Sequence, residues 1–148
     1  MLNQSLGVLA LVGSGLVAGV LFAVALSVLP GLFAMPPGRY VYAQRLIGRN
    51  WDPTMPIVVL TSVALDIGLA VATGGSQRRL FALCAVLLVG VSVVSHFCNV
   101  PINRRVKSLD PDRMPADWQD PRPVWRRWHL LRTVLAVLAL LGNAIALT

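Results

Sequence analysis

Four apolar stretches, each close to the length of a membrane-spanning helix, constrain this chain more than any other feature. No charged residue precedes Arg39, and charged residues make up only 13% of the chain, against about 25% in a soluble domain. About 20 apolar residues in an α-helix span the ~30 Å hydrocarbon core of a bilayer. The sequence therefore predicts an all-α fold, a four-transmembrane-helix bundle that forms one domain over residues 1–148. The predicted helices cover residues 6–34, 55–73, 80–100 and 127–147.

Basic residues are concentrated in two of the segments that connect these stretches. Residues 36–54 contain three and residues 101–127 contain seven, whereas the connection between the second and third stretches contains only Arg78 and Arg79. Because basic loops remain on the cytoplasmic side of a membrane, we expect both termini on the non-cytoplasmic side of the cell (inner) membrane. This orientation in a lipid bilayer explains the net charge of +7 without a nucleic acid partner.

The two cysteines argue against one class of membrane enzyme. Cys84 and Cys98 are fourteen residues apart in one predicted helix, which separates them by about 21 Å at 1.5 Å per residue. A disulfide needs Cα atoms within about 7 Å. Thiol–disulfide chemistry within one chain is therefore not expected.

Small residues recur at every fourth position along the first stretch. Gly15, Gly19, Ala23 and Ser27 form this stripe, and small residues let helix backbones approach closely inside a membrane. The stripe predicts close packing within the bundle. A homodimer through the Gly15/Gly19 face is the alternative.

Asp66 is the only carboxylate in the four stretches, and it lies near the middle of the second. Ionisable residues at this depth are costly and commonly mark functional sites. One interpretation is a protonated or hydrogen-bonded aspartate that joins helices. The others are a proton-handling or substrate-binding group, a counter-charge for Arg132, and the coupling residue of a small transporter or proton-coupled carrier.

Polar side chains from the third and fourth stretches are expected to meet at the cytoplasmic end of the bundle. Residues three or four positions apart share one face of a helix, and the two stretches are antiparallel neighbours. The first polar face consists of His96, Asn99 and Asn103. The second consists of Trp125, His129 and Arg132. Together they predict a polar pocket that faces the cytoplasm.

The chain has only two histidines, His96 and His129. Two imidazoles are too few for a closed zinc site, but imidazole suits copper and iron equally. A pair at matched depth could also provide both axial ligands of a haem. The pattern leaves open whether the site holds copper, iron, haem or no cofactor.

Three sequence elements, taken together, are similar to those of a known membrane family. They are residues 18–22 (AGVLF) with Leu29 and Pro30, residues 99–103 (NVPIN), and the Trp125, Trp128, His129, Arg132 pattern. With these elements, nearly the whole chain resembles the anthrone-oxygenase-like family of small four-helix membrane proteins. Characterised members oxidise anthrones, which are tricyclic aromatic polyketides, to quinones with dioxygen. The resemblance implies a membrane-embedded oxygenase of polyketide biosynthesis.

The implied chemistry assigns a role to each polar residue. An anthrone has an acidic methylene whose enolate reacts readily with dioxygen, the co-substrate. His129 or His96 would be the general base, because an imidazole pKa near ~6.5 suits proton transfer near neutral pH. Arg132 would stabilise the enolate oxygen.

Four further side chains would bind the small aromatic substrate: Asn99, Asn103, Trp125 and Trp128. The asparagines would support the oxyanion, and the indole rings would stack on the substrate. A non-enzymatic membrane scaffold remains the alternative, and it would need none of this polar face.

Overall fold

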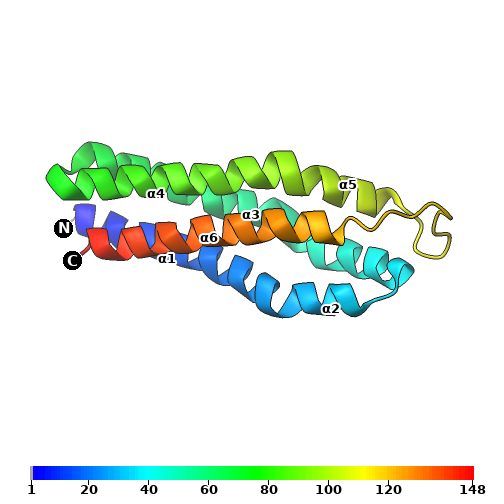
Figure 1. Cartoon of the computed structure of the whole chain (residues 1–148). Coiled ribbons are helices and arrows are strands. Elements are labelled where there is room, and N and C mark those ends of the chain that lie inside the picture. Colours follow the sequence, from blue (N-terminus) through cyan, green and yellow to red (C-terminus); the bar gives the residue numbers. More distant parts are fainter. Residues whose placement is uncertain (1) are drawn as a thin grey trace.

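The computed structural model describes residues 2–148, and every regular element in this range is helical. Figure 1 shows long helices lying side by side, with both termini at one end. Two short π-helical segments, η1 and η2, join α1 to α2 and α4 to α5. The elements are α1 (Leu2–Ala23), η1 (Val24–Val28), α2 (Leu29–Ala34), α3 (Pro37–Ala72), α4 (Gly75–Val94), η2 (Ser95–Asn99), α5 (Val100–Ser108) and α6 (Arg122–Ala146).

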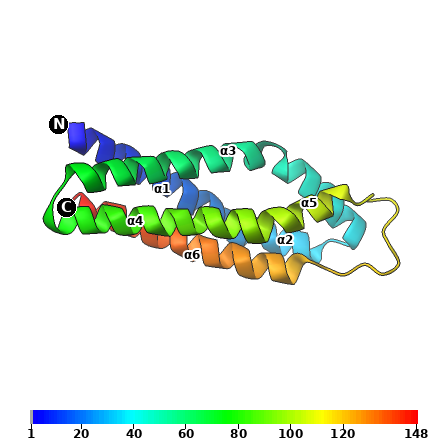
Figure 2. The ribbon, with the colours of Figure 1, turned by 90° about the horizontal axis from the view of Figure 1, so that it is seen from above.

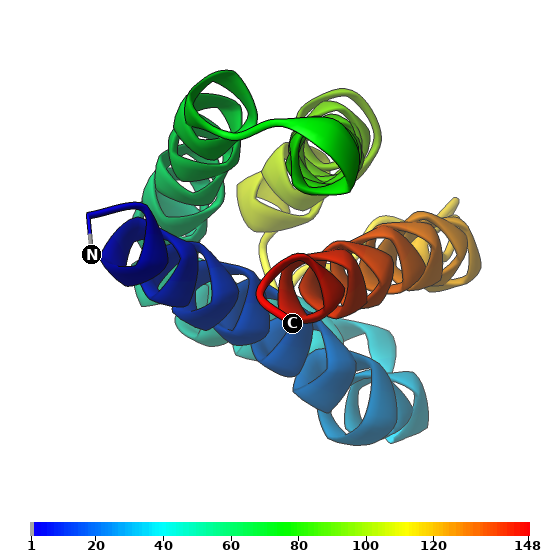
Figure 3. The ribbon, with the colours of Figure 1, turned by 90° about the vertical axis from the view of Figure 1, so that its left-hand side faces the viewer.

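Four continuous helical segments are long and apolar enough to cross a membrane, which confirms the predicted number of spans. Each packs mainly against two others. Helix α1 contacts α3 and α6, and α4 contacts the same two helices from the other side of the bundle, as the view from the terminal end shows (Figure 3). The side of the membrane on which the termini lie stays a prediction. The four segments are Leu2–Ala34, Pro37–Ala72, Gly75–Ser108 and Arg122–Ala146.

The predicted helix boundaries need one large correction. Residues 36–54 were expected to connect two spans, but all of them except Pro36 are helical and continuous with the second span in the 36-residue helix α3. Pro53 and Pro56 lie inside this helix, and Figure 2 shows it bent between its two halves. Proline bends a helix by removing a hydrogen bond and crowding the preceding turn. The prolines here mark a bend rather than an end.

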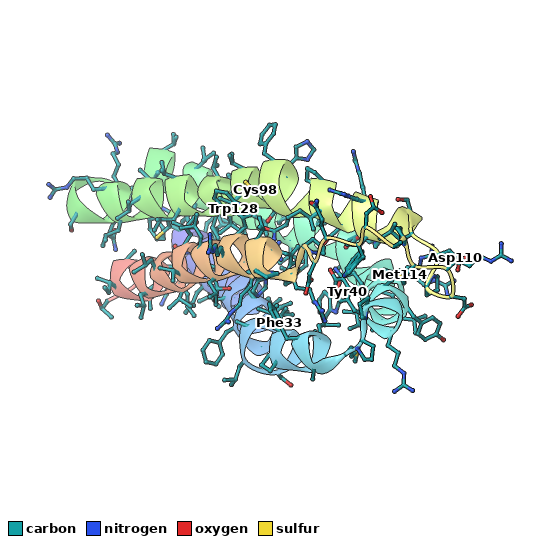
Figure 4. All side chains as sticks on the ribbon, turned by 45° about the vertical axis from the view of Figure 1, so that its right-hand side comes forward. Phe33, Tyr40, Cys98, Asp110, Met114 and Trp128 are labelled. Atoms are coloured by element: carbon teal, nitrogen blue, oxygen red, sulfur yellow. The ribbon has the colours of Figure 1, made fainter. Side chains whose placement is uncertain are left out.

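The longest helices exceed the thickness of a bilayer core. At 1.5 Å per residue, α3 alone is about 54 Å long, against a hydrocarbon core of about 30 Å. We call the end opposite the termini the cap, which consists of α2, residues 37–54, α5 and the connection 109–121. Tyr40 and Met114 lie close together in it, with Phe33 on α2 (Figure 4). Its buried core consists of Leu32, Tyr40, Val41 and Val106.

Two arginines stabilise the cap by donating hydrogen bonds to backbone carbonyls near the ends of α2 and α5. Arg122 Nη1 donates to the carbonyls of Leu32 at 2.7 Å and Met35 at 2.8 Å, and Arg45 Nε donates to the carbonyl of Lys107 at 3.0 Å. These bonds go to carbonyls near helix ends, which lack the usual partner four residues later. Hydrogen bonds from Arg122 also hold the pKa of Asp120 below its ordinary value.

Two apolar layers fill the bundle between the cap and the termini, and all four spans contribute to each. The inner layer, nearer to the cap, consists of Val17, Ala18, Leu21, Val59, Val63, Leu88, Val91, Ala136 and Ala139. The terminal layer consists of Ala10, Leu69, Phe81 and Ala146. Between them lie the fully buried polar side chains of Ser14, Asp66 and Asn143.

Most of the small-residue stripe of α1 lies outside the bundle, so the expectation of internal packing is wrong there. Gly19, Ala23 and Ser27 are exposed, and a Cβ at Gly19 would meet open space. Only the Gly15 end of the stripe packs inward, toward Leu140 of α6. The helix instead buries the neighbouring face that carries Ser14, Val17 and Leu21, whose larger side chains fill the core. A homodimer through the stripe stays a prediction.

Candidate functional site

A group of polar side chains meets near the start of α6, between the cap and the inner layer. Trp125, His129 and Arg132 follow one another at helical spacing on α6, and the prediction that they share one face is confirmed. The Trp125 and His129 rings stack with centroids 4.9 Å apart and planes 9° from parallel. The Arg132 guanidinium carbon lies 5.7 Å from the Trp125 ring centroid. His129 itself is fully buried.

Both ring nitrogens of His129 are engaged. Nδ1 lies 2.9 Å from Arg132 Nη2 and 3.3 Å from Arg132 Nε, and Nε2 lies 2.9 Å from the backbone carbonyl of Leu21. Arginine can only donate hydrogen bonds, so Nδ1 accepts. A carbonyl can only accept, so Nε2 carries a hydrogen and donates. These partners assign a neutral imidazole with its proton on Nε2 and its lone pair on Nδ1.

The two π-helical segments border this group from opposite sides. Leu21, whose carbonyl binds His129, lies just before η1, and Ser95 is the first residue of η2. Ser95 Oγ accepts a hydrogen bond from Arg132 Nη1 at 3.1 Å. π-Helical turns interrupt the regular hydrogen-bond ladder and are frequent at functional sites. A carbonyl from the turn of α1 before η1 and the hydroxyl of the first residue of η2 therefore bind the same pair of residues.

Two asparagines connect η2 and α5 to Trp125, which confirms the predicted convergence for Asn99 and Asn103. Trp125 Nε1 donates to Asn103 Oδ1 at 2.8 Å, and Asn99 Nδ2 donates to the Trp125 backbone carbonyl at 3.3 Å. Asn99 is buried, and its Oδ1 has no hydrogen-bond partner among residues 2–148. The group thus retains one free acceptor.

Gln44 belongs to this group and is absent from the sequence prediction. Its Nε2 donates to Asn103 Oδ1 at 3.2 Å, and its side chain is buried. Residues 36–54 were expected only to connect two spans, so their side chains were not assigned to the buried site. A helical interpretation would have placed Gln44 one turn after Tyr40, on the buried face.

His96 does not join the group, and the expectation that it shares a face with Asn99 is wrong. Its side chain is exposed and packs edge-on against Phe97, with ring centroids 5.0 Å apart. The reason is η2, which runs from Ser95 to Asn99. A π-turn holds more residues than an α-turn, so a spacing of three no longer returns to the same face.

Trp128 and Asp66 also lie apart from the group. Trp128 is 38% exposed on the outer side of α6. Asp66 is separated from Arg132 by the inner layer, so it is not the counter-charge that was one of its predicted roles. Within residues 2–148 the ion pairs are Lys107–Asp52 and Arg122–Asp120. Arg132 therefore forms no ion pair within the described chain.

A copper, iron or haem site held by both histidines does not fit this arrangement. His96 lies exposed on the outside of the bundle, and both nitrogens of the buried His129 already have partners. No group of three or more His, Cys, Asp or Glu side chains with metal-binding geometry occurs among the described residues. The donor set at His129 is suited to holding a proton or an anion.

Comparison with known proteins gives one match. The family model described as anthrone oxygenase matches residues 44–142, a range that begins at Gln44 and includes every side chain of the group on η2, α5 and α6. No curated protein and no solved structure matches the chain significantly.

Proposed function

Because the chain belongs to the anthrone oxygenase family, we propose that it is a membrane-embedded oxygenase that converts an aromatic polyketide such as an anthrone to a quinone. The observation that supports this proposal is the unpaired charge of Arg132. Arginine has five N–H donors, and Arg132 uses three of them on His129 and Ser95. The remaining two, one on each terminal nitrogen, are available to an anionic oxygen. A cation at this depth is costly without a partner.

The proposed reaction needs no reductant. The anthrone methylene first loses a proton and becomes an enolate, whose oxygen accepts hydrogen bonds from the Arg132 guanidinium. Dioxygen then forms a bond with the carbanionic carbon, and protonation gives a hydroperoxide. The hydroperoxide loses water and leaves a carbonyl. One oxygen atom of dioxygen enters the quinone and the other leaves as water, so atoms and electrons balance.

His129 is proposed as the general base, in a role that depends on Arg132. The Nδ1 lone pair is occupied while Arg132 donates to it. When the guanidinium turns toward the substrate oxygen, this lone pair becomes free to accept the methylene proton. The Nε2–H bond to the Leu21 carbonyl then stabilises the imidazolium. Substrate binding therefore frees the base. General base catalysis requires such a base within hydrogen-bond reach of the proton that it removes.

The neighbouring side chains would orient the substrate. The free Asn99 Oδ1 is suited to accept a hydrogen bond from a phenolic hydroxyl of a polyketide. Trp125 is already stacked on His129 and is proposed to hold the imidazole in place. Trp128 is exposed on the adjacent surface and is proposed to stack on an aromatic substrate that enters from the lipid.

Oxygen uptake by the purified protein in lipid nanodiscs tests the proposal. With an added anthrone, we expect quinone to form faster than in protein-free nanodiscs, with one dioxygen consumed per quinone. Extended treatment with a metal chelator should leave the rate unchanged, because the proposed steps use only side chains. A rate equal to spontaneous oxidation would contradict the proposed function. Loss of activity on chelation that a metal restores would contradict the metal-free mechanism.

The orientation in the membrane is a second proposal, supported by the basic residues of the cap. We propose that the cap lies in the cytoplasm and both termini lie outside. Single cysteines introduced at Asn3 and Thr148, in a chain without Cys84 and Cys98, should react with an impermeant thiol reagent added to whole cells. A cysteine at Pro115 should react only after the cells are opened. All three positions are exposed in the folded chain, so external labelling at position 115 would invert the orientation.

A further inference from the structure

One level of the bundle, between the inner and terminal layers, contains polar side chains that the proposed reaction does not use. Ser14 of α1, Asp66 of α3 and Asn143 of α6 meet there, and each is 0% exposed. The fourth span contributes the equally buried Cys84, whose thiol donates to the Ala139 carbonyl at 3.4 Å. Apart from this thiol, Asp66 is the only titratable group that residues 2–148 place at this level.

The hydrogen bonds at this level leave two acceptors unfilled. Asn143 Nδ2 donates to Ser14 Oγ at 3.2 Å and lies 3.5 Å from Asp66 Oδ2, and Ser14 Oγ donates to the Ala10 carbonyl at 2.9 Å. Asp66 Oδ1 and Asn143 Oδ1 are buried and have no partner among the described residues. Both atoms are acceptors when Asp66 is ionised, so this network is one donor short.

Nothing nearby compensates a negative charge on Asp66. The inner layer separates it from Arg132, and the terminal layer separates it from the chain ends, since each layer has members on all four spans. Neither ion pair of the described chain includes Asp66. An isolated carboxylate in such surroundings is strongly disfavoured, and a buried acceptor without a partner adds to the cost.

We propose that Asp66, Asn143 and Ser14 form a proton-binding site in which Asp66 is held as a neutral carboxylic acid. The O–H group on Asp66 Oδ1 donates to Asn143 Oδ1, while Asn143 Nδ2 donates to Asp66 Oδ2. One proton thus pairs both of the unfilled oxygens and completes an acid–amide pair. Ser14 continues the hydrogen bonds to α1, so the bound proton links three of the four spans.

Infrared spectroscopy of the intact protein in lipid tests this site, because the composition makes the signal assignable. The chain has six acidic residues, all aspartates, and the other five are exposed. Exposed carboxyl groups are ionised at neutral pH. We therefore expect a single carboxylic acid C=O band at pH 7. After transfer to D₂O this band should shift only slowly, because the group is buried. The Asp66→Asn variant should lose it entirely, and Asp117→Asn, which changes an exposed carboxylate, should retain it.

Two further measurements separate the acid–amide pair from other arrangements. Asn143→Leu should move the band to higher frequency, because the carboxyl loses its hydrogen-bond partner, with Leu69→Ala as a control for altered packing alone. A wild-type spectrum without this band at pH 7, or a band that persists in Asp66→Asn, would overturn the proposal. A band that disappears when sodium is added at constant pH would overturn it in favour of a cation site.

Discussion

Replacing Arg132 with lysine should lower kcat/KM for anthrone oxidation about 100-fold, the typical effect of losing one oxyanion donor. The guanidinium is a planar fork that holds His129 and Ser95 and still has an N–H free on each terminal nitrogen. A lysine ammonium has three donors on a flexible stem and cannot reproduce that geometry. Oxygen uptake and quinone formation, measured over a range of anthrone concentrations, give the value.

Arg126→Lys is the matched control, because Arg126 is exposed on the same helix and has no part in the proposed reaction. It should retain nearly full activity. His129→Ala should be impaired as severely as Arg132→Lys, since it removes the base and the acceptor for the guanidinium. If folded, membrane-inserted His129→Ala and Arg132→Lys proteins both match the Arg126→Lys rate, the proposed catalytic site is wrong.

Trp125→Ala should lower the free energy of unfolding by about 3–5 kcal/mol, the usual cost of removing a large buried aromatic side chain. The indole is only 7% exposed and stacks on His129. Its Nε1 donates to Asn103, so its removal also leaves that acceptor with one partner fewer. Unfolding in mixed micelles with increasing dodecyl sulfate, followed by circular dichroism, measures the change.

Trp128→Ala provides the comparison, because it removes an identical side chain three residues later on the exposed side of α6. Its effect on stability should stay within about 0.5 kcal/mol. Trp125→Phe should lie between the two, since it preserves much of the stacking and loses the N–H donor. Equal losses for the two alanine variants would mean that Trp125 does not anchor the polar group.

The sequence was sufficient to predict the spans because the membrane imposes a simple requirement. A helix that crosses lipid must be apolar over about 20 residues, and this length is visible without any knowledge of packing. The shared face of Trp125, His129 and Arg132 was predictable for a similar reason, because helical spacing alone determines it. Their convergence with Asn99 and Asn103 followed from the antiparallel order of the last two spans.

The features that were not predicted depend on contacts between distant segments. The first half of α3 is rich in arginine and flanked by proline, and it is helical because it packs against α2 and α5 in the cap. The position of His96 depends on η2, a change of hydrogen-bond register that the pattern of side chains does not reveal. Gln44 could not be assigned until residues 36–54 were known to be helical.

The candidate site includes one backbone group, the carbonyl of Leu21, which does not depend on the side chain at that position. Any residue at position 21 would present the same oxygen to His129, so alanine scanning at this position would report the lost packing of the buried Leu21 side chain and not the role of its carbonyl. What the site requires of α1 is the path of its main chain at Leu21. Inserting or deleting one residue there would displace the acceptor while every polar side chain of the site stayed unchanged. Engineering of this site therefore has to treat the length of the first span as fixed.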